Sequence, residues 1–433
     1  MSVVPRSPKS TRRVAYFAAA AVLFGLPSFA AAQFFNHDHD NGSNGEETFS
    51  LVATVQTPDN GTLNGFDIGF VDPSVGEYFL ADSTDQAVLA IDTRSKIPTF
   101  LDKGGFAGAP ATCAVPHACN GPDGVVPVHT HGGVQLWVGN YPSNIKILDS
   151  QSGMEIATIN TGGKFRTDEG CWDPEDHLIL YANDADSPPF ISFISTDTQK
   201  IVKQIKFDGL AGDGPNATNG IEQCQWDPRE HAFYMNLPEV NGNGADTADG
   251  NVVVINPHTL QIVQTFDIPV AQCAGPQGMA IGPAPQILLG CNAKGPPDTG
   301  TGASAAGTGP QNAAIINEEN GDIIQVLANQ GGNDEVWFNP GDGHYALAEG
   351  SHTTTDFLGI VDSKPIAVDQ QIAIAPAPAA GSGPHSVSAD PVANEIYMPI
   401  EASVGSSLCP TAGVGCVAIF KSNRPSHFAD RGH

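Results

Sequence analysis

A set of polar residues recurs along the chain and could do chemistry if the fold brings its members together. Each is the third residue of a short recurring segment, and successive members are 45 to 57 residues apart. The set, called the polar ring below, consists of Asp67, Asp123, Asp168, Glu222, Gln277, Asp334 and His385. Five of the seven carry carboxylates, which repel one another in a confined space and must then either hold protons or bind a cation.

The polar ring predicts a divalent metal site. Oxygen ligands favour calcium or magnesium, and we expect calcium first, although the imidazole of His385 would also suit a transition metal. Glu169 and Glu335 directly follow two ring members and, with His385, are the candidate catalytic acids or bases. The alternative is a structural role, in which the ring side chains only hydrogen-bond to neighbouring strands or to channel water.

Other histidines are weaker candidates for metal or ligand contact. His129 and His131 would share one side of an extended strand, but at the far end from the polar ring. His37 and His39 fall in a segment expected to be flexible, and His352 falls in a long loop. No GxSxG, HExxH or phosphate-loop motif and no basic groove occurs, which disfavours serine hydrolases, zincins, nucleotide-dependent enzymes and nucleic-acid-binding proteins.

The elements that must position these residues are β-strands. The recurring segments read GFDIGFVDP, GPDGVVPVH, RTDEGCWDP, GIEQCQWDP, GPQGMAIGP, GNDEVWFNP and GPHSVSADP. Runs rich in β-branched and aromatic residues follow each segment, so each repeat predicts a four-stranded meander, the unit of a propeller blade. The first strand of each blade would run along the central channel, which places the recurring polar residues around its axis.

Seven repeats predict an all-β, seven-bladed β-propeller over residues 48–433. The last repeat ends after its third strand, CVAIFKS, while FSLVATVQT stands before the first repeat without a partner. Pairing these two segments would complete the last blade and remove an exposed edge. Long loops after the second strands of blades four to seven should surround the mouth that carries the polar ring, as expected of a ligand site.

The second halves of several repeats resemble a known repeat type. The segments VLAIDTRS, IKILDSQSGMEIATI and VVVINPHTLQIVQTF resemble the YVTN-type repeats of bacterial exported propellers. This resemblance implies a seven-bladed propeller and an exported location but no particular reaction, because one fold serves many functions. Lactonases of the gluconolactonase kind also hold a divalent ion on a propeller axis, but none of their motifs is matched here.

The N-terminus predicts export. Residues 1–32 combine four basic residues, an apolar run and a small-residue stretch, as in a removable signal peptide, and residues 33–47 follow as a flexible acidic segment with histidines. Removing the four basic residues from 19 Lys and Arg leaves 15, against 47 Asp and Glu. Such a surface repels nucleic acid and anionic lipid. We therefore expect a periplasmic or secreted monomer, without membrane insertion, whose partner is a small molecule or another exported protein.

Eight cysteines in an exported chain predict disulfide bonds rather than metal thiolates. Two pairs would close short loops, one pair flanks a hairpin turn, and the remaining two cysteines lie in successive repeats. The predicted pairs are Cys113–Cys119, Cys409–Cys416, Cys273–Cys291 and Cys171–Cys224, with no free thiol.

Two functions remain open from the sequence. One is a non-catalytic propeller that binds a small ligand, a divalent cation or both at the looped mouth of its channel. The other is a metal-dependent, lactonase-like hydrolase or lyase acting on a small molecule. The first is slightly favoured.

Overall fold

The β-type runs of the sequence form antiparallel sheets in a computed structural model of the chain. The structure describes residues 47–110, 112–113, 115, 117–292, 312–350, 355–376 and 384–428. The predicted signal peptide, His37, His39, His352 and most of the long loop of blade five lie outside these residues. In the described residues, no helix is long and apolar enough to span a bilayer.

The first four blades follow the chain in order, each as one four-stranded sheet. Blade one comprises β2 (Gly69–Asp72), β3 (Glu77–Asp82), β4 (Ala87–Asp92) and β5 (Pro98–Leu101). Blade two comprises β6 (Val125–Thr130), β7 (Gly133–Asn140), β8 (Asn144–Asp149) and β9 (Glu155–Asn160). Blade three comprises β10 (Gly170–Asp173), β11 (Leu178–Asn183), β12 (Phe190–Ser195) and β13 (Lys200–Lys206). Blade four comprises β14 (Cys224–Asp227), β15 (Ala232–Leu237), β16 (Gly250–Asn256) and β17 (Gln261–Ile268).

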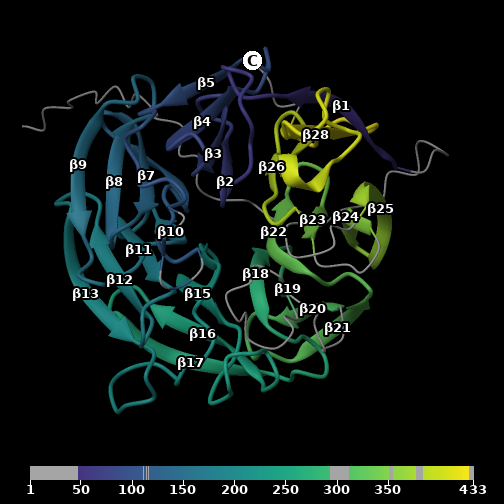
Figure 1. The fold of residues 1–433 in the computed structure, drawn as a ribbon. Coiled ribbons are helices and arrows are strands. Elements are labelled where there is room, and N and C mark those ends of the chain that lie inside the picture. Colours follow the sequence, from purple (N-terminus) through teal and green to yellow (C-terminus); the bar gives the residue numbers. More distant parts are fainter. Residues whose placement is uncertain are drawn as a thin grey trace, which may run out of the picture. The chain divides into compact units, whose positions relative to one another are not determined.

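The last three blades complete the ring that Figure 1 shows. Blade five comprises β18 (Pro276–Ile281), β19 (Gln286–Cys291), β20 (Asn312–Asn317) and β21 (Ile323–Ala328). Blade six comprises β22 (Asn333–Asn339), β23 (His344–Glu349), β24 (Thr355–Ser363) and β25 (Ile366–Pro376). Blade seven comprises β26 (Ser388–Asp390), β27 (Glu395–Ile400), β28 (Cys416–Ser422) and β1 (Phe49–Val55), with the short 3-10 helix η1 (Ala402–Val404) between β27 and β28.

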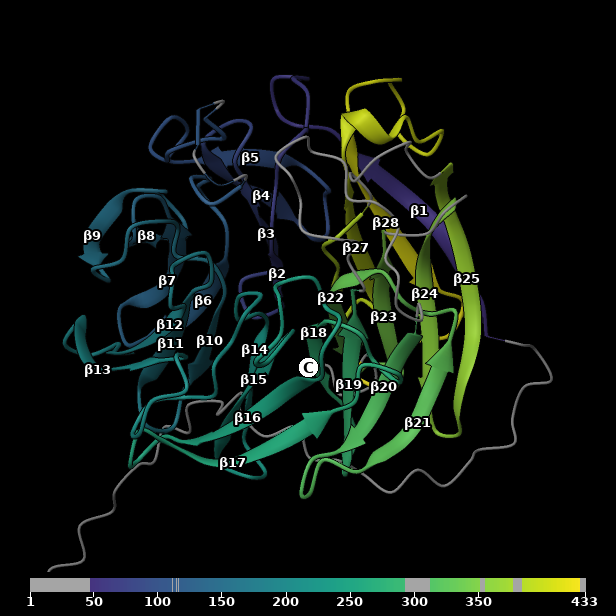
Figure 2. The same cartoon turned by 60° about the horizontal axis from the view of Figure 1, so that its bottom comes forward.

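The N-terminal strand closes the last blade, as the sequence predicts. Strand β1 pairs antiparallel with β28, from Phe49 opposite Ser422 to Val55 opposite Val417. Figure 2 shows the two strands side by side at the edge of blade seven. This pairing covers the edge of β28 that would otherwise be free to pair with another chain.

A repeated turn explains why the inner strands are short. Strands β2, β10, β14 and β26 each end at an aspartate, and a proline, which cannot donate to the ladder, follows. The aspartate side chain then accepts a hydrogen bond from the backbone N–H two residues on, as Asp72 does from Ser74 and Asp173 from Glu175. The residue before the second strand adopts the left-handed conformation, as at Gly76 (φ 70°) and His177 (φ 54°). These turns define one face of the propeller, called the turn face below; the opposite face, where the inner strands begin, is called the loop face.

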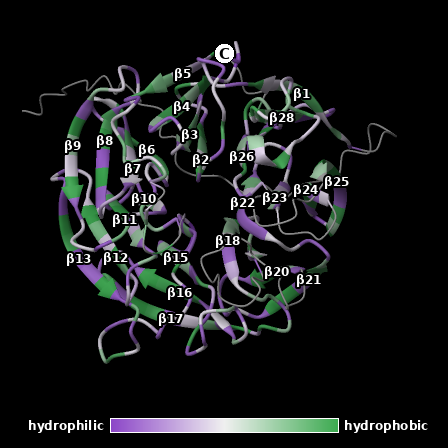
Figure 3. Cartoon of the chain, viewed as in Figure 1, coloured by the Kyte–Doolittle hydropathy of each residue, from purple (hydrophilic) through white to green (hydrophobic). Residues whose placement is uncertain are grey.

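The hydrophobic core lies between neighbouring blades. In one example, Leu180 and Phe193 of blade three pack with Phe233 and Met235 of blade four, and all four side chains are fully buried. Figure 3 shows hydrophobic residues along the middle of the strands, while the hydrophilic start of β22 borders the centre of the ring. The blades are therefore held to one another by apolar packing, and the polar ends of the inner strands are left to the channel.

All four predicted disulfides are present, and no described cysteine is free. The bonds are Cys113–Cys119, Cys171–Cys224, Cys273–Cys291 and Cys409–Cys416. Cys171–Cys224 joins the inner strands β10 and β14 of neighbouring blades. Four disulfides suggest an oxidising, exported environment.

Candidate functional site

The ring members occupy equivalent places at the loop-face end of the inner strands. In each of four blades the ring residue donates its backbone N–H to a carbonyl of the second strand. The bonds run from Asp67 to Ala81, Asp123 to Gly139, Asp168 to Ala182 and Glu222 to Asn236, at 3.0, 3.0, 2.9 and 3.0 Å. Gln277 and Asp334 lie at register shifts in β18 and β22, and His385 precedes β26.

The structure brings Asp67, Asp123 and Asp168 together. One carboxylate oxygen of each lies within 4.8 Å of the others, and Asp123 and Asp168 are buried. On the other side of the ring, Gln277 Nε2 donates to Glu222 Oε1 at 3.0 Å. The ring residues predicted from the repeats thus form two groups of polar contacts. One is the cluster of three carboxylates, called the carboxylate cluster below, and the other is the contact between Gln277 and Glu222.

Arg166 lies within this cluster and is not among the residues predicted from the sequence. Its Nη1 is 3.4 Å from Asp67 Oδ2 and 3.4 Å from Asp123 Oδ1, and its Nη2 is 2.7 Å from Asp168 Oδ2 and 3.1 Å from Asp184 Oδ2. The Arg166 side chain is only 14 % exposed. The guanidinium of Arg166 therefore already supplies part of the positive charge that a bound metal ion would bring to these carboxylates.

A signal for Arg166 was present in the repeats. Six of the seven recurring segments begin with glycine, and the third begins with Arg166. Because the first residue stands two positions before the ring residue, on the same side of an extended chain, a side chain at that place can reach the channel. Asp184 has no counterpart in the recurring segments and could not have been found in this way.

One guanidinium faces four carboxylates, so the cluster keeps an excess of negative charge if all are ionised. Burial raises the pKa of Asp67, Asp123 and Asp168 above the ordinary value, although the charge of Arg166 opposes this rise. Burial alone would lower the pKa of Arg166, but Asp168, Asp184 and the other two carboxylates raise it well above its ordinary value, so the guanidinium stays charged. The cluster is therefore fixed in place by Arg166 but not neutralised by it.

Two buried carboxylate oxygens of the cluster keep unused acceptor capacity. In the part of the chain that the structure describes, Asp123 Oδ2 and Asp168 Oδ1 have no hydrogen-bond partner. Buried acceptors are normally paired, and leaving one unpaired costs about 1–3 kcal/mol. Asp123 and Asp168 thus each keep one buried acceptor that Arg166 does not use.

Next to the polar ring, the channel is closed by a set of residues that we call the buried layer. It consists of the residues that follow the seven ring members, and all of them are buried: Ile68, Gly124, Glu169, Gln223, Gly278, Glu335 and Ser386. Glu169 of blade three and Glu335 of blade six hydrogen-bond to one another across the channel, and Gln223 Nε2 donates to Glu335 Oε2 at 2.9 Å. Burial, followed by the opposing Glu335 carboxyl, raises the pKa of Glu169 well above its ordinary value, which favours the protonated form of this carboxyl.

The candidate histidines lie in two different places. His385 lies at the ring, where its Nε2 is 2.9 Å from the Phe66 carbonyl and its imidazole stacks on the Phe66 ring at 4.7 Å. Burial lowers its pKa, but the charges of Asp67, Glu401 and Asp334 outweigh this and raise it. His129 lies at the turn face, with Nε2 2.9 Å from Asp72 Oδ2 and its ring stacked on Trp172.

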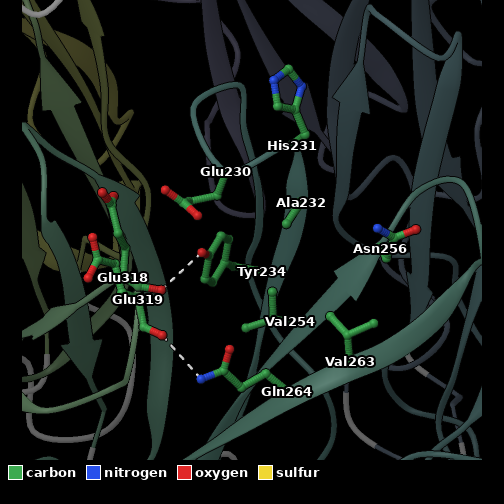
Figure 4. Close-up of a pocket in the computed structure, with 10 residues that line it drawn as sticks. All are labelled: Glu230, His231, Ala232, Tyr234, Val254, Asn256, Val263, Gln264, Glu318 and Glu319. Carbon is green, nitrogen blue, oxygen red and sulfur yellow. Dashed lines mark hydrogen bonds between the residues drawn. The ribbon is translucent and has the colours of Figure 1, made fainter.

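Two hollows lie away from the ring. One, of about 190 Å³, lies in the channel on the far side of the buried layer, where aromatic residues of the inner strands line it. The other, of about 230 Å³, lies between blades four and five away from the channel (Figure 4). At its floor Tyr234 Oη donates to the Glu318 carbonyl at 3.0 Å, and Gln264 Nε2 donates to the Glu319 carbonyl at 3.1 Å. It contains no member of the polar ring.

Comparison with known proteins supports the fold. No protein-family model matches the chain, and no curated protein is significantly similar to it in sequence. Among solved structures, the chain is similar to one in the crystal structure of a mitotic checkpoint complex, with a TM-score of 0.57 and 11 % sequence identity. The match covers 92 % of this chain and 99 % of the other. At this identity the likeness shows the propeller fold alone.

Proposed function

We propose that this protein is an exported, non-catalytic propeller of the YVTN-repeat type, periplasmic or secreted, that binds a divalent cation at its polar ring. Calcium is the expected ion. The observation that carries the proposal is the carboxylate cluster, in which one oxygen of each of Asp67, Asp123 and Asp168 lies within 4.8 Å of the others. Asp123 and Asp168 also each have one buried oxygen without a hydrogen-bond partner in the described residues.

The chemistry of the cluster suits a hard cation. Calcium takes six to eight oxygen ligands, often with water among them, and several carboxylates from separate strands can provide the charged part of that set. Arg166 offsets one of the four charges it faces, so an added cation would lower the electrostatic free energy of the cluster further. A small cationic ligand could satisfy the same oxygens, and the loops of the loop face would then contact the rest of it.

The second candidate is a metal-dependent hydrolase or lyase. The observation in its favour is the pair of Glu169 and Glu335, which follow ring members and whose pKa values are raised by burial. A carboxylic acid kept protonated near a metal could donate a proton to a leaving group. Both carboxyls are buried, however, so a substrate held by a metal ion at the cluster would have to displace the buried layer to reach them. Binding without catalysis therefore agrees better with the geometry.

The test is a thermal melt of the metal-free protein with chelator and with millimolar calcium. A cation that binds only the folded state raises the melting temperature as its concentration exceeds the dissociation constant. We expect such a rise in the wild type and a clearly smaller one in Asp168→Asn. The matched control is Asp197→Asn, at a turn of blade three, where the side chain is 69 % exposed.

Three results would count against the proposal in different ways. Equal melting of wild type and Asp168→Asn under all conditions would make the cluster structural. A rise in melting temperature with zinc or copper, but not with calcium, would indicate a metal site that includes His385. Turnover of a lactone or ester that chelator abolishes and one ion restores would favour the enzyme.

A further inference from the structure

A second cavity lies in the channel on the turn-face side of the buried layer. Its volume is about 190 Å³, and its lining comes from the inner strands of five blades, at or next to β2, β6, β10, β14 and β22. The lining includes four aromatic side chains: Phe70, Trp172, Trp226 and Trp337. Phe70 and Trp337 meet edge to face, with ring centroids 5.2 Å apart. We call this space the aromatic cavity.

The aromatic cavity is separate from the carboxylate cluster. The buried layer stands between them, with Glu169 6 %, Gln223 3 % and Glu335 2 % exposed. Farther along the inner strands exposure rises again, since Phe70, Trp172 and Trp226 are partly exposed. The cluster is thus reached from the loop face and the aromatic cavity from the turn face, so the two can be occupied independently.

Gln225 is one of three polar side chains in the lining of the aromatic cavity, and the other two, Glu169 and Gln223, are buried. Its side chain lines the cavity and is partly exposed, and no hydrogen-bond partner for its amide is present in the described residues. Gln223, two residues earlier, differs: it donates to Glu335 and accepts from the Met279 backbone N–H. The amide of Gln223 is therefore used in hydrogen bonds within the protein, whereas the Gln225 amide is available to a molecule in the cavity.

We propose that the aromatic cavity binds a small, uncharged aromatic molecule that carries one hydrogen-bonding group, with Gln225 as the partner of that group. The size is suitable, because an apolar cavity of roughly 150 Å³ already holds benzene. Aromatic walls favour an aromatic guest through edge-to-face and offset contacts. The amide adds selectivity, since a polar group on the guest must be matched by a partner when it leaves water.

Two fluorinated probes test the proposal by fluorine NMR in the presence of chelator. 4-Fluoroacetophenone carries a carbonyl acceptor, and 4-fluoroethylbenzene is a similar molecule without one. We expect both to bind the wild type, with the ketone about fivefold tighter, as for one net hydrogen bond. Tryptophan fluorescence gives a second readout, because three of the four tryptophans line the cavity and the fourth, Trp137, is fully buried in blade two.

Variants of Gln225 show where the probes bind. Gln225→Leu keeps a similar size and should lose the preference for the ketone while still binding both probes. Gln225→Trp fills the cavity and should abolish binding of both. Gln261→Leu, at the exposed start of β17, is the matched control and should behave as wild type.

The inference fails if neither probe binds the folded wild type, if the ketone preference persists in Gln225→Leu, or if Gln225→Trp binds as tightly as wild type. Because the wild-type measurement needs no variant, a failure of either variant to fold does not remove the test. Chelator is present throughout, so the result does not depend on the cation site. Loss of cation binding would contradict the proposed function and leave this inference standing.

Discussion

At the scale of single residues, Arg166 reduces the repulsion within the carboxylate cluster. Four carboxylates lie within 3.4 Å of its guanidinium nitrogens, and these come from blades one, two and three and from the loop that follows β11. Arginine suits this place because its several fixed donors can serve several carboxylates at once and its charge persists under burial. The residue therefore ties three blades together at the axis while it shares the site with any incoming cation.

Removing Arg166 should destabilise the protein and strengthen its response to calcium. In Arg166→Gln the carboxylates lose their counter-charge, and breaking a buried ion pair costs on the order of 3–5 kcal/mol. The cluster then has more charge for a cation to offset, so calcium should bind more tightly and restore part of the loss. Chemical denaturation with and without calcium measures both effects.

The matched control for this variant is Arg229→Gln. Arg229 also pairs with two carboxylates, Asp227 and Glu318, but away from the channel. The Arg229→Gln variant should be less stable than wild type and should show no stronger response to calcium. A calcium response in Arg166→Gln no larger than in wild type would mean that the guanidinium and the ion do not compete for one site.

The Glu169–Glu335 pair predicts a pH dependence. Burial raises the folded-state pKa of Glu169 above its value in the unfolded chain, so the folded protein holds a proton that the unfolded chain has lost. The resulting stability is complete below the unfolded pKa of roughly 4.3 and is lost as pH rises towards the folded pKa. The unfolding free energy of the wild type should therefore fall as pH rises above the unfolded pKa.

Glu169→Gln keeps an uncharged group in the same place and should make this fall shallower. Denaturant titrations at several pH values compare it with wild type and with Glu319→Gln, whose side chain is exposed. A slope that is unchanged in Glu169→Gln but altered in Glu319→Gln would contradict the assignment of the buried proton.

At the scale of elements, the inner strands carry both the site and its mechanical support. In five blades the ring residue and the buried-layer residue come just before the inner strand, and in blades five and six they lie at its start. The disulfide Cys171–Cys224 ties two of these strands together. Positions on rigid strands can be held within a small tolerance, which a cation site requires.

This disulfide should contribute more stability than a short-range one. Its cysteines are 53 residues apart, whereas Cys113 and Cys119 are 6 apart. In the chain-entropy model the stabilisation grows with the logarithm of the loop length, so the difference is about 2 kcal/mol. Replacing each pair by two alanines and measuring unfolding in denaturant compares them. Equal losses would mean that strain or residual structure, rather than loop length, controls the effect.

Features that follow from the sequence repeats could be predicted, whereas contacts between individual side chains could not. The strands, blade count, closure by β1 and cysteine pairs could be predicted because they follow from repeats, spacing and edge protection. The contact of Arg166 with Asp184 could not, because it depends on side-chain rotamers in one blade. The hydrogen bond between Glu169 and Glu335 was equally hidden, since those residues are 166 positions apart and meet only when the ring closes.

At the scale of the whole molecule, the channel is divided into two parts by one buried layer. The loop-face part is carboxylate-rich, and the turn-face part is aromatic. Closing the ring through β1 and β28 creates this arrangement, because all seven inner strands must be held around one axis. The acidic composition of the chain, with a formal charge of −28, further favours cations over anions at the loop face.

The most direct test of the cation site is calorimetric titration of calcium into the metal-free protein at neutral pH. We expect one ion bound per chain in the wild type and no binding in the double variant Asp123→Asn with Asp168→Asn, which keeps the shape of both side chains and removes two charges. Absence of binding in the folded wild type, or equal binding in wild type and double variant, would contradict it.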